Sequence, residues 1–596
     1  MCGIFGIVFP SERPLGEILT QAAKRLSYRG YDSVGAAAIS ADGRIDLRKA
    51  PGKVEEVAEK LGFSELSGLR GICQLRWATF GAPSYENAQP HLDSDGDLVG
   101  AHNGNVVNNA ELRRQFLAEG MVVRGTNDGE SCVHAVERYV NRGMTLPEAV
   151  RAAYRDLLGD FTFVIANNRE NMLVAVKKGS GLVVGLGPDF TCCSSDLPSI
   201  LPLTRKVIPI EDGEMVVLRP EGVALYRVED GQPVHREPTI ITDEMGLPEK
   251  GGFPHFMLKE IHEQQAAARE LVHLLEHSEY LGTIAESLAK GRRVFLVGSG
   301  SSYHACLVGS SFFARLAGIL AIPVLPQQFV EQFGPALGAD DVALYVSQSG
   351  ETKDVLNALN YAAGKGVRAL GLVNVLGSTL TRKAERYLPL ACGWEISVPA
   401  TKTYTNQVIA LIALAARAAG RDLGPLGAAS TWLAKTIQEM DGTARALAKQ
   451  LAKTQKLFIL GYGLGHGIAL EGALKVKEVT GIPCEGMFSS EFKHGPLAMV
   501  EQGTPVLFTA SPAGCEMLTN HVTEVTCRGG YAIVIAPEHE PLRAEASQFI
   551  PLPVGSEVEY AVVGAVPFQL FAYHLAVTLG FDPDYPRNLS KTLTVD

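Results

Sequence analysis

"RRVFLVGSGSS" (residues 292–302) is an apolar run that ends in a turn rich in glycine and serine. A second stretch of the same character, QKLFILGYGLG, occupies residues 455–465. Gly298 closes the first apolar run, and Gly461 closes the second at the corresponding place. A short apolar run bounded by turn residues is typical of a buried strand in a parallel sheet. The two stretches therefore predict two similar strand-and-turn units.

A further pair of stretches repeats at the same offset. VALYVSQSG begins at residue 342 and TPVLFTASP at residue 504. Within them, Ser347 and Ala510 have the same separation along the chain as Gly298 and Gly461. A constant offset through two strand-and-turn pairs indicates a duplicated domain. Because the strands alternate with long Ala- and Leu-rich helical patterns, we expect two α/β domains with parallel sheets. We place them at residues 285–425 and 450–585.

The composition is that of an ordinary globular protein with an ample core. The 596 residues are 46% hydrophobic and 20% charged, and by length they predict about four domains. The net charge of −11 and the pI of about 5.8 argue against nucleic acid or an anionic membrane as partner. No uncharged apolar run long enough to span a bilayer and no basic-then-apolar leader stand out.

The ten cysteines are dispersed and contain no CxxC pair. This usage predicts free thiols and a cytoplasmic location. No cluster of histidine and cysteine has the spacing of metal ligands, so we expect neither a metal nor a nucleotide cofactor.

The first part of the chain, residues 2–235, is different in pattern. Short apolar runs bounded by Gly, Asn and Asp predict strands, and GESCVHAVERYV (129–140) has apolar residues at helical spacing. We predict an α+β sandwich with helices outside the sheets. Residues 236–284 contain a Pro- and Gly-rich break and then a helical pattern, which predicts a linker and connecting helix. Residues 586–596 form a polar tail.

Cys2 follows the initiator methionine, so removal of Met1 would place a thiol and a free α-amine on one residue. Such a residue can act as a nucleophile with its own α-amine as base. The alternative is an ordinary buried or spare cysteine, and position alone favours that alternative. The motifs that accompany Cys2 reverse this preference.

These motifs carry the groups that hydrolysis of an amino-acid amide needs. Asn103 and Gly104 of HNG can supply two donors to a tetrahedral oxyanion. Arg76 of RWATFG can bind a carboxylate bidentately, and Asp128 of TNDGE can bind an amine. Singly, HNG is more often a turn and TNDG a loop. Together with YRGYDS (28–33), they favour a site for an α-amino acid.

In this order the five motifs resemble the class II glutamine amidotransferases, the N-terminal-nucleophile amidohydrolases, over residues 2 to about 220. The resemblance implies an αββα sandwich in which Cys2 attacks the amide of L-glutamine, forms a thioester and releases ammonia. It implies that Asn103 and Gly104 form the oxyanion hole. The residues implied to bind glutamine are Arg76, Trp77, Thr79 and Asp128, with Trp77 also gating an ammonia passage.

The turn SQSGET (347–352) lies between a predicted strand and a predicted helix, where hydroxyls and N–H groups can bind an anion. A second turn, GSGSSYH (298–304), adds Ser301 and Ser302. The alternative is helix capping and turn chemistry. Two such turns at the carboxyl ends of parallel strands favour a ligand there. The second copy has ASPAGC in the corresponding place and lacks most of these hydroxyls, so we predict phosphate binding by the first copy alone.

The second copy carries other groups. EGALKVKE places Glu471, Lys475 and Glu478 on one face of a helix, SEFKHGP contains His494, and NLSKTLTVD contains Lys591. Taken alone, such helix charges are more often a solvated face, and a tail lysine is usually exposed.

Residues 285–596 resemble the paired, flavodoxin-like sugar-isomerase (SIS) domains of the glutamine:fructose-6-phosphate amidotransferase family, through SQSGET, TKTYTNQ, ALKVKE, FKHGP and PRNLSKTLTV. The resemblance implies that Lys591 forms a Schiff base with the C2 ketone of an open-chain hexose phosphate. It implies that Glu478 moves a proton between C1 and C2, and that His494, from a partner subunit in a homodimer, assists ring opening. The residues implied to bind the sugar phosphate are Ser302, Ser347, Gln348, Ser349, Thr352, Val398, Ala400 and Lys475.

The implied reaction converts D-fructose 6-phosphate and L-glutamine to D-glucosamine 6-phosphate and L-glutamate, the first step of hexosamine synthesis. The chain departs from the family pattern at Phe80, Gln89 and Ala400, where histidine, histidine and serine are usual. An alternative is therefore an amidotransferase or deaminase that acts on a different ketose or amino-sugar phosphate. A sugar-phosphate sensor is a further alternative, although it would not need Cys2 or Lys591.

Overall fold

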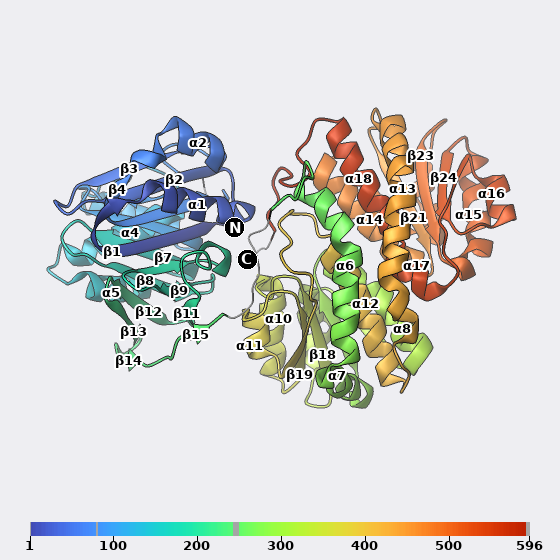
Figure 1. Ribbon diagram of the computed structural model, residues 1–596, viewed down its shortest axis with the longest axis horizontal. Coiled ribbons are helices and arrows are strands. Elements are labelled where there is room, and N and C mark those ends of the chain that lie inside the picture. The colour runs from blue at the N-terminus through green and yellow to red at the C-terminus, as the bar shows by residue number, and fades with distance from the viewer. Residues whose placement is uncertain (1, 79–80, 242–248, 592–596) are drawn as a thin grey trace. The chain divides into compact units, whose positions relative to one another are not determined.

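The computed structural model describes residues 2–78, 81–241 and 249–591. They form two compact units, one up to residue 241 and one from residue 249. Each unit is described by itself (Figure 1).

The first unit contains two antiparallel sheets packed face to face. The eight-stranded sheet has the order β15 (Thr239–Ile240), β11 (Lys206–Pro209), β9 (Val183–Leu186), β10 (Thr191–Ser194), β1 (Gly3–Pro14), β4 (Ser67–Arg76), β2 (Ser33–Ile39), β3 (Ile45–Pro51). The seven-stranded sheet has the order β14 (Pro233–Val234), β13 (Gly222–Arg227), β12 (Glu214–Arg219), β8 (Leu173–Lys178), β7 (Gly159–Asn167), β6 (Leu98–Val106), β5 (His91–Leu92).

Strand β1 shows why this arrangement forms. Ile4 and Val8 belong to the core between the two sheets, whereas Phe5 and Ile7 belong to the core on the outer face of the eight-stranded sheet. Because side chains alternate along a strand, an unbroken apolar run such as this one must be covered on both faces.

Helices cover the outer faces of both sheets. Helices α1 (Gly16–Leu26) and α2 (Val54–Lys60) pack on the eight-stranded sheet, and α3 (Asn109–Ala118), α4 (Asp128–Val140) and α5 (Leu146–Asp156) pack on the seven-stranded sheet. The predicted αββα sandwich is confirmed.

The second unit contains two five-stranded parallel sheets with the same order. The first is β17 (Ala321–Val324), β16 (Val294–Gly298), β18 (Val342–Ser347), β19 (Arg368–Val373), β20 (Arg386–Pro389). The second is β22 (Cys484–Phe488), β21 (Leu457–Tyr462), β23 (Pro505–Ala510), β24 (Tyr531–Ala536), β25 (Gln548–Pro551). The first four strands of each sheet, taken along the chain, all begin at the offset that separates Gly298 from Gly461. The predicted duplication therefore extends well beyond the two quoted pairs.

One large core fills the space between the two parallel sheets, as Figure 1 shows. It is built by α6 (Phe256–Glu276), α7 (Glu279–Lys290), α8 (Ser301–Phe312), α12 (Lys402–Ala418), α13 (Ala429–Leu451), α14 (Gly465–Thr480), α17 (Glu557–Val563) and α18 (Val566–Thr578). Helix α10 (Lys353–Ala363) covers the outer face of the first sheet, and α15 (Cys515–Thr526) that of the second. In this strand order, the polarity of the crossovers reverses between the first and third strands, which is where a ligand binds.

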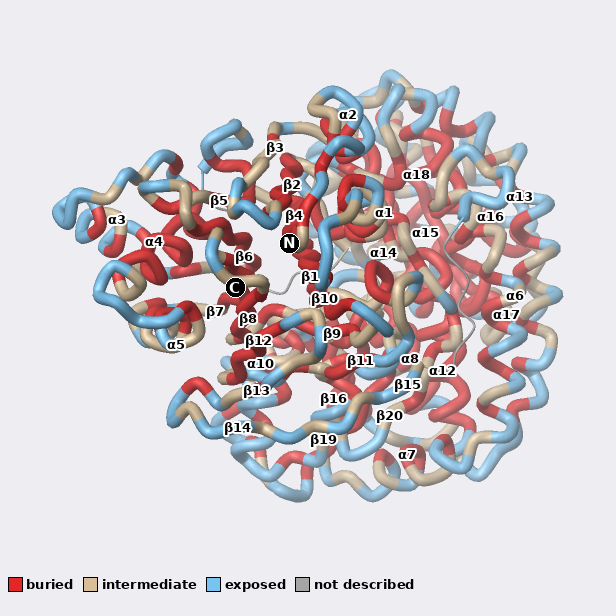
Figure 2. Tube along the Cα trace, turned by 60° about the vertical axis from the view of Figure 1, so that its left-hand side comes forward, coloured by how far each residue is buried: buried red, intermediate tan, exposed pale blue. Residues whose placement is uncertain are grey.

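The stretch Glu557–Thr578 has the length and hydropathy of a membrane span, a feature that the sequence pattern did not bring out. It is 89% buried inside the protein over its most apolar window. In Figure 2 this region is largely red, as expected for helices in the core of a large α/β unit.

Candidate active sites

Cys2 precedes β1, and its thiol contacts the backbone of Trp77. The Trp77 N–H donates to Sγ over 3.3 Å, and Sγ lies 3.6 Å from the Trp77 carbonyl oxygen. Arg29 Nε donates to the Cys2 carbonyl oxygen over 3.2 Å and pairs with Asp196 at 2.9 Å. Burial raises the pKa of the Cys2 thiol. Because only a thiolate is a strong nucleophile, this thiol needs a base.

Asn103 and Gly104 lie on β6. Ser195 joins the Asn103 side chain to β1, the strand that follows Cys2. The Asn103 amide donates to Ser195 Oγ over 2.7 Å, and the same oxygen accepts from the Ile4 N–H at 2.8 Å. Gly104 has a φ of +131°, and a Cβ there would collide with the Asp160 carbonyl oxygen. Only glycine therefore fits this position.

Asp128 and Arg76 are both buried close to the Cys2 thiol, whose pKa they influence in opposite directions. Asp128 begins α4, and its Oδ2 accepts from the Val106 N–H at 2.9 Å. The Arg76 guanidinium donates to the Gly81 carbonyl oxygen over 2.6 Å. A buried carboxylate and a buried guanidinium beside one thiol can bind the two charged ends of an amino acid.

Two sequence-predicted positions of this site, Thr79 and the departure Phe80, lie outside the described residues. The Trp77 ring meets Tyr31 edge to face, with centroids 5.7 Å apart.

A second site lies at the carboxyl ends of β16 and β18, at the reversal of strand order. It is a cavity of about 150 Å³ that the turns after both strands line, together with the loop before α12, one face of α14 and the tail. The sequence-predicted residues that line it are Ser302, Ser347, Gln348, Ser349, Thr352, Val398, Ala400, Glu478 and Lys591. Ser299, Ser301, Leu589 and Ser590 also line it.

The turn after β18 is ordered by its own hydroxyls. Ser347 Oγ lies 3.3 Å from Thr352 Oγ1 and accepts from the Gly350 N–H at 3.0 Å. Ser349 Oγ accepts from the Glu351 N–H at 3.1 Å. These bonds fix hydroxyl and N–H groups around one end of the cavity, as an oxyanion of phosphate requires.

Helix α14 carries the charged groups of the second copy; of these, Glu478 lines the cavity, whereas the sequence-predicted Lys475 lies behind it. Lys475 Nζ lies 2.5 Å from Glu478 Oε2 and 3.4 Å from Glu471 Oε1, and it donates to Ser301 Oγ over 3.2 Å. The side chains of Lys475 and Glu471 have no exposed surface, so the alternative of a solvated helix face is wrong for them. Burial alone lowers the pKa of Lys475, but the two carboxylates raise it above its usual value.

Glu478 remains accessible from the cavity, with 18% of its side chain exposed. Burial raises the pKa of Glu478, and Lys475 only partly offsets this effect. A carboxyl group whose pKa is raised can both hold and release a proton near neutral pH.

Lys591 is buried, contrary to the usual exposure of a tail lysine, with 4% of its side chain exposed. Its Nζ donates to Glu395 Oε2 over 2.6 Å and to the Ser397 carbonyl oxygen over 2.8 Å. The tail that carries it is anchored at Asp584, whose side chain accepts from the Phe256 and Met257 N–H groups at the start of α6.

His494 is exposed and is not among the residues that line the cavity. The Val398 N–H donates to the Asp584 carbonyl oxygen over 2.9 Å, so its carbonyl oxygen is the backbone group left for a ligand.

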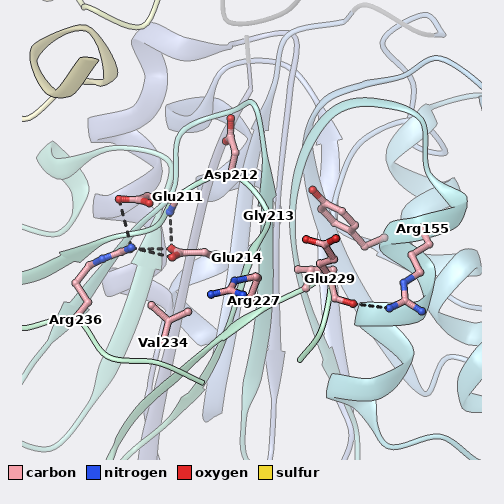
Figure 3. A pocket seen from close by; sticks show the side chains of 11 residues that line it. Arg155, Glu211, Asp212, Gly213, Glu214, Arg227, Glu229, Val234 and Arg236 are labelled. Atoms are coloured by element: carbon pink, nitrogen blue, oxygen red, sulfur yellow. Dashed lines mark hydrogen bonds and ion pairs between the residues drawn. The ribbon is translucent and has the colours of Figure 1, made fainter. Parts of the chain in front are cut away.

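A larger cavity, of about 700 Å³, lies beside β12 and β13 in the first unit (Figure 3). None of the sequence-predicted residues lines it. Among its charged side chains, Arg236 pairs with Glu211 and Glu214, and Arg227 pairs with Asp230. Arg155 donates to the Glu229 carbonyl oxygen. This cavity therefore has the character of a surface depression crossed by ion pairs.

Comparison with known proteins identifies the domains in which the two candidate sites lie. The family model of the SIS domain matches residues 287–417 and 450–579, and that of a glutamine amidotransferase domain matches 76–187. A glutamine--fructose-6-phosphate aminotransferase [isomerizing] of Methanothermobacter thermautotrophicus is 39% identical. The alignment has 601 positions and covers the whole of both chains. A relative of the same name from Aquifex aeolicus is 38% identical over the full length of both chains.

The chain belongs to the glutamine--fructose-6-phosphate aminotransferase family.

Among solved structures, the C-terminal domain of glucosamine-fructose-6-phosphate aminotransferase from Francisella tularensis is 27% identical. It covers 57% of this chain and all of its own, with a TM-score of 0.53. Tagatose-6-phosphate ketose/aldose isomerase from Escherichia coli shares the fold, with a TM-score of 0.51 and 20% identity. The match covers 56% of this chain and 97% of the isomerase.

Of the three departures from the family pattern, Gln89 has a clear structural role. Its Oε1 accepts from the His102 N–H at 2.7 Å, and its Nε2 donates to the His102 carbonyl oxygen over 3.1 Å. Since His102 precedes Asn103 on β6, Gln89 holds the backbone of the strand that carries Asn103. Ala400 lines the cavity at the ends of β16 and β18 without a polar group.

Glu395 and Glu260, which lie behind Lys591, were not found from the sequence. Both are buried; Glu395 pairs with Lys591, 196 residues away, and Glu260 accepts from the Ile396 N–H, 136 residues away. In the sequence, each is a single acidic residue among its neighbours, in WEIS (394–397) and in LKEI (258–261). A single acidic residue is usually exposed, so neither stretch indicates a buried site.

Proposed function

We propose that this chain converts D-fructose 6-phosphate and L-glutamine to D-glucosamine 6-phosphate and L-glutamate, the first step of hexosamine synthesis. The observation that carries the proposal is the presence of both candidate sites in one chain whose relatives of that name match it from end to end.

In the first unit, Cys2 would be the nucleophile. Its buried thiol is protonated at neutral pH, and among the described residues no imidazole or carboxylate hydrogen-bonds to Sγ. The α-amine of Cys2, once Met1 is removed, would therefore take the proton. The Asn103 amide and the Gly104 N–H would stabilise the oxyanion, while Arg76, Trp77, Thr79 and Asp128 would hold the glutamine.

In the second unit, the turns after β16 and β18 would hold the phosphate, and Lys591 would condense with the C2 ketone and release water. Ammonia would then add to C2, and the bond between C2 and the Lys591 nitrogen would break, which frees the lysine and leaves the imine of ammonia at C2. Glu478 would carry the proton from C1 to C2, because it lies on the cavity wall with a raised pKa. Lys475 would offset negative charge that develops on the sugar.

The proposal includes a homodimer in which the partner contributes His494, because this residue is exposed outside the cavity of its own chain. All ten cysteines, which lie within the described residues, are free thiols, and this supports a reducing, cytoplasmic location.

The test is a coupled assay of glutamate and hexosamine phosphate with L-glutamine and fructose 6-phosphate. We expect equal amounts of both products. A Cys2→Ala variant should lose glutamine-dependent synthesis while keeping synthesis from added ammonia. Release of ammonia from glucosamine 6-phosphate, without glutamine-dependent synthesis, would favour a deaminase instead.

The dimer has its own test. Subunits carrying His494→Ala and subunits carrying Lys591→Ala should each be inactive as synthases. When they are mixed under conditions of subunit exchange, about a quarter of the wild-type sites should be restored, since half of the dimers are hybrids with one intact site. No recovery in verified hybrids would contradict the shared site.

A further inference from the structure

Lys591 Nζ is held by one carboxylate, that of Glu395, at 2.6 Å. The Glu395 side chain has no exposed surface, and 4% of the Lys591 side chain is exposed. Because water screens neither partner, this ion pair is far stronger than one on the surface. Lys591 lines the cavity, and Glu395 lies behind it.

Glu395 is also bound by neutral donors that belong to the loop before α12 and its first turn. Its Oε1 accepts from the Thr401 and Thr403 N–H groups at 3.0 and 3.1 Å, and its Oε2 accepts from Thr403 Oγ1 at 2.7 Å. Burial alone raises the pKa of Glu395, but Lys591 and these donors together lower it to about 2. The carboxylate is therefore ionised at neutral pH.

Condensation of an amine with a ketone conserves charge when it starts from the ammonium and ends at the iminium. The nitrogen lone pair forms the bond to C2, the C2–O bond breaks, and the oxygen leaves as water with two protons from nitrogen. One proton and one positive charge remain on nitrogen. A carboxylate beside this nitrogen thus faces a cation before and after the reaction.

We propose that Glu395 is the counter-ion of Lys591, first as the ammonium and then as the iminium that this lysine forms with the sugar. The inference rests on the proposed function, because it assumes that Lys591 condenses with a ketose phosphate. It assigns to Glu395 the task of keeping the imine protonated, which keeps C2 electrophilic enough for ammonia to add there and displace the lysine.

Glu260 on α6 has a different role. Its Oε1 accepts from the Ile396 and Ser397 N–H groups, and its buried Oε2 has no hydrogen-bond partner among the described residues. Burial and the charge of Glu395 raise the pKa of Glu260 to about 8, so at neutral pH it is mainly neutral. It supports the loop that carries Glu395 without competing for Lys591.

Besides Glu260, four titratable groups interact electrostatically with Lys591 or Glu395. They are Lys402 on α12, Lys475 and Glu478 on α14, and Cys392, which precedes Glu395 in the chain. Glu478 pairs with Lys475, and Lys402 pairs with Glu263 at 2.7 Å. Glu395 is thus the carboxylate in direct contact with the reacting nitrogen.

The test is reductive trapping of the full-length protein with fructose 6-phosphate and sodium cyanoborohydride, which delivers hydride to C2 of the iminium and leaves a secondary amine on Lys591. Intact mass and peptide mapping measure the yield between pH 6 and 9. In the wild type we expect a yield that does not fall up to pH 9. In Glu395→Gln we expect at least a tenfold lower yield at pH 7.5 and recovery toward pH 6, since each unit of pKa lost by the imine is tenfold.

Glu395→Asp, which keeps the charge, should restore the wild-type pH profile. Glu263→Gln is the matched control, because Glu263 belongs to the same ionic cluster without touching Lys591, and it should also keep that profile. Glutaminase activity and thermal melting verify folding of each variant.

Equal trapping by Glu395→Gln and wild type at every pH would overturn the counter-ion role. A trapping yield of the wild type that falls about tenfold for each pH unit above pH 7 would also overturn it, and this measurement needs no variant. Absence of any trapping in the wild type would instead contradict the proposed function.

Discussion

The two halves of the duplicated unit have the same strand order and a nearly constant offset, yet their polar residues differ. In the first copy, the turn after β18 carries Ser347, Ser349 and Thr352, which line a cavity. In the second copy, the turn after β23 holds Pro512 in a short helical turn, and Cys515 is buried. The same backbone thus presents hydroxyls to a cavity in one copy and a proline and a buried thiol in the other.

The difference is reversed at the helix that follows the first strand of each copy. In the second copy this helix is α14, and its Glu478 lines the cavity of the first copy. Behind it, Lys475 and Glu471 bond Ser301, and Glu471 also bonds His304 of α8. A duplicated fold can therefore separate two functions. One copy can keep the residues for binding a phosphate, and the other can keep the residues for proton transfer.

The largest effect should come from the chemistry of the second copy. Glu478→Gln should lower synthase turnover about 10²–10⁴-fold, since the variant cannot exchange a proton with the sugar. Binding of fructose 6-phosphate, measured by calorimetry, and glutaminase activity should change little. Glu485→Gln, exposed on β22, is the control. Full turnover by Glu478→Gln would assign the proton transfer to another group.

The next effect should come from binding by the first copy. The double variant Ser347→Ala with Thr352→Ala should raise the KM for fructose 6-phosphate about 10- to 100-fold, because hydrogen bonds to a charged phosphate are lost. Ala510 and Cys515 stand at the offset of these two residues in the second copy, so the control there removes the neighbouring hydroxyl: Ser511→Ala should leave the KM unaltered. Equal effects of the two changes would mean that both copies bind the sugar.

A smaller effect should distinguish the copies by pH. Glu260 supports the polar loop of the first copy, whereas the second copy has the buried apolar residues Tyr560–Val563 near the corresponding offset. Since burial raises the pKa of Glu260 to about 8, the folded state binds more protons than the unfolded state above the usual carboxyl pKa. This group therefore lowers the free energy of unfolding as pH rises toward 8.

Replacing Glu260 by Gln removes this dependence. The melting temperature of the variant relative to wild type should be a few degrees higher at pH 9 than at pH 6. Glu263→Gln should show no such gain, because Lys402 and Lys259 overcome the effect of burial and lower the pKa of Glu263. A constant difference between variant and wild type across pH would show that Glu260 does not titrate in this range.

The smallest effect should follow from grafting hydroxyls into the second copy. Ala510→Ser with Cys515→Thr places hydroxyls at the offset of Ser347 and Thr352, but no tail lysine and no second charged helix complete a site there. Calorimetry should still find one fructose 6-phosphate bound per chain. A second binding event would show that the turn alone is enough.

The fold could be predicted largely from the sequence because its signals are local. Apolar runs closed by Gly and Ser define strands, and the constant offset between the paired stretches defines the repeat. The turns with hydroxyls could be predicted for the same reason, since Ser347 to Thr352 are neighbours in the chain.

The groups behind Lys591 could not be predicted in this way. Glu395 is 196 residues from Lys591, and Glu260 is 136 residues from Ile396. No local pattern marks a buried acid whose partners come from such distances. Likewise, charges on one face of α14 predicted proximity, but only packing against α8 shows that they are buried.

The anchoring of Asp584 to α6 has a consequence for kinetics. Asp584 and Lys591 are close neighbours in the chain, so the fully extended tail reaches at most about 25 Å from the anchor. A lysine on so short a tether meets the sugar as an intramolecular reactant at an effective concentration of roughly millimolar or more. Lengthening the tether would dilute the nucleophile without altering a single contact in the cavity.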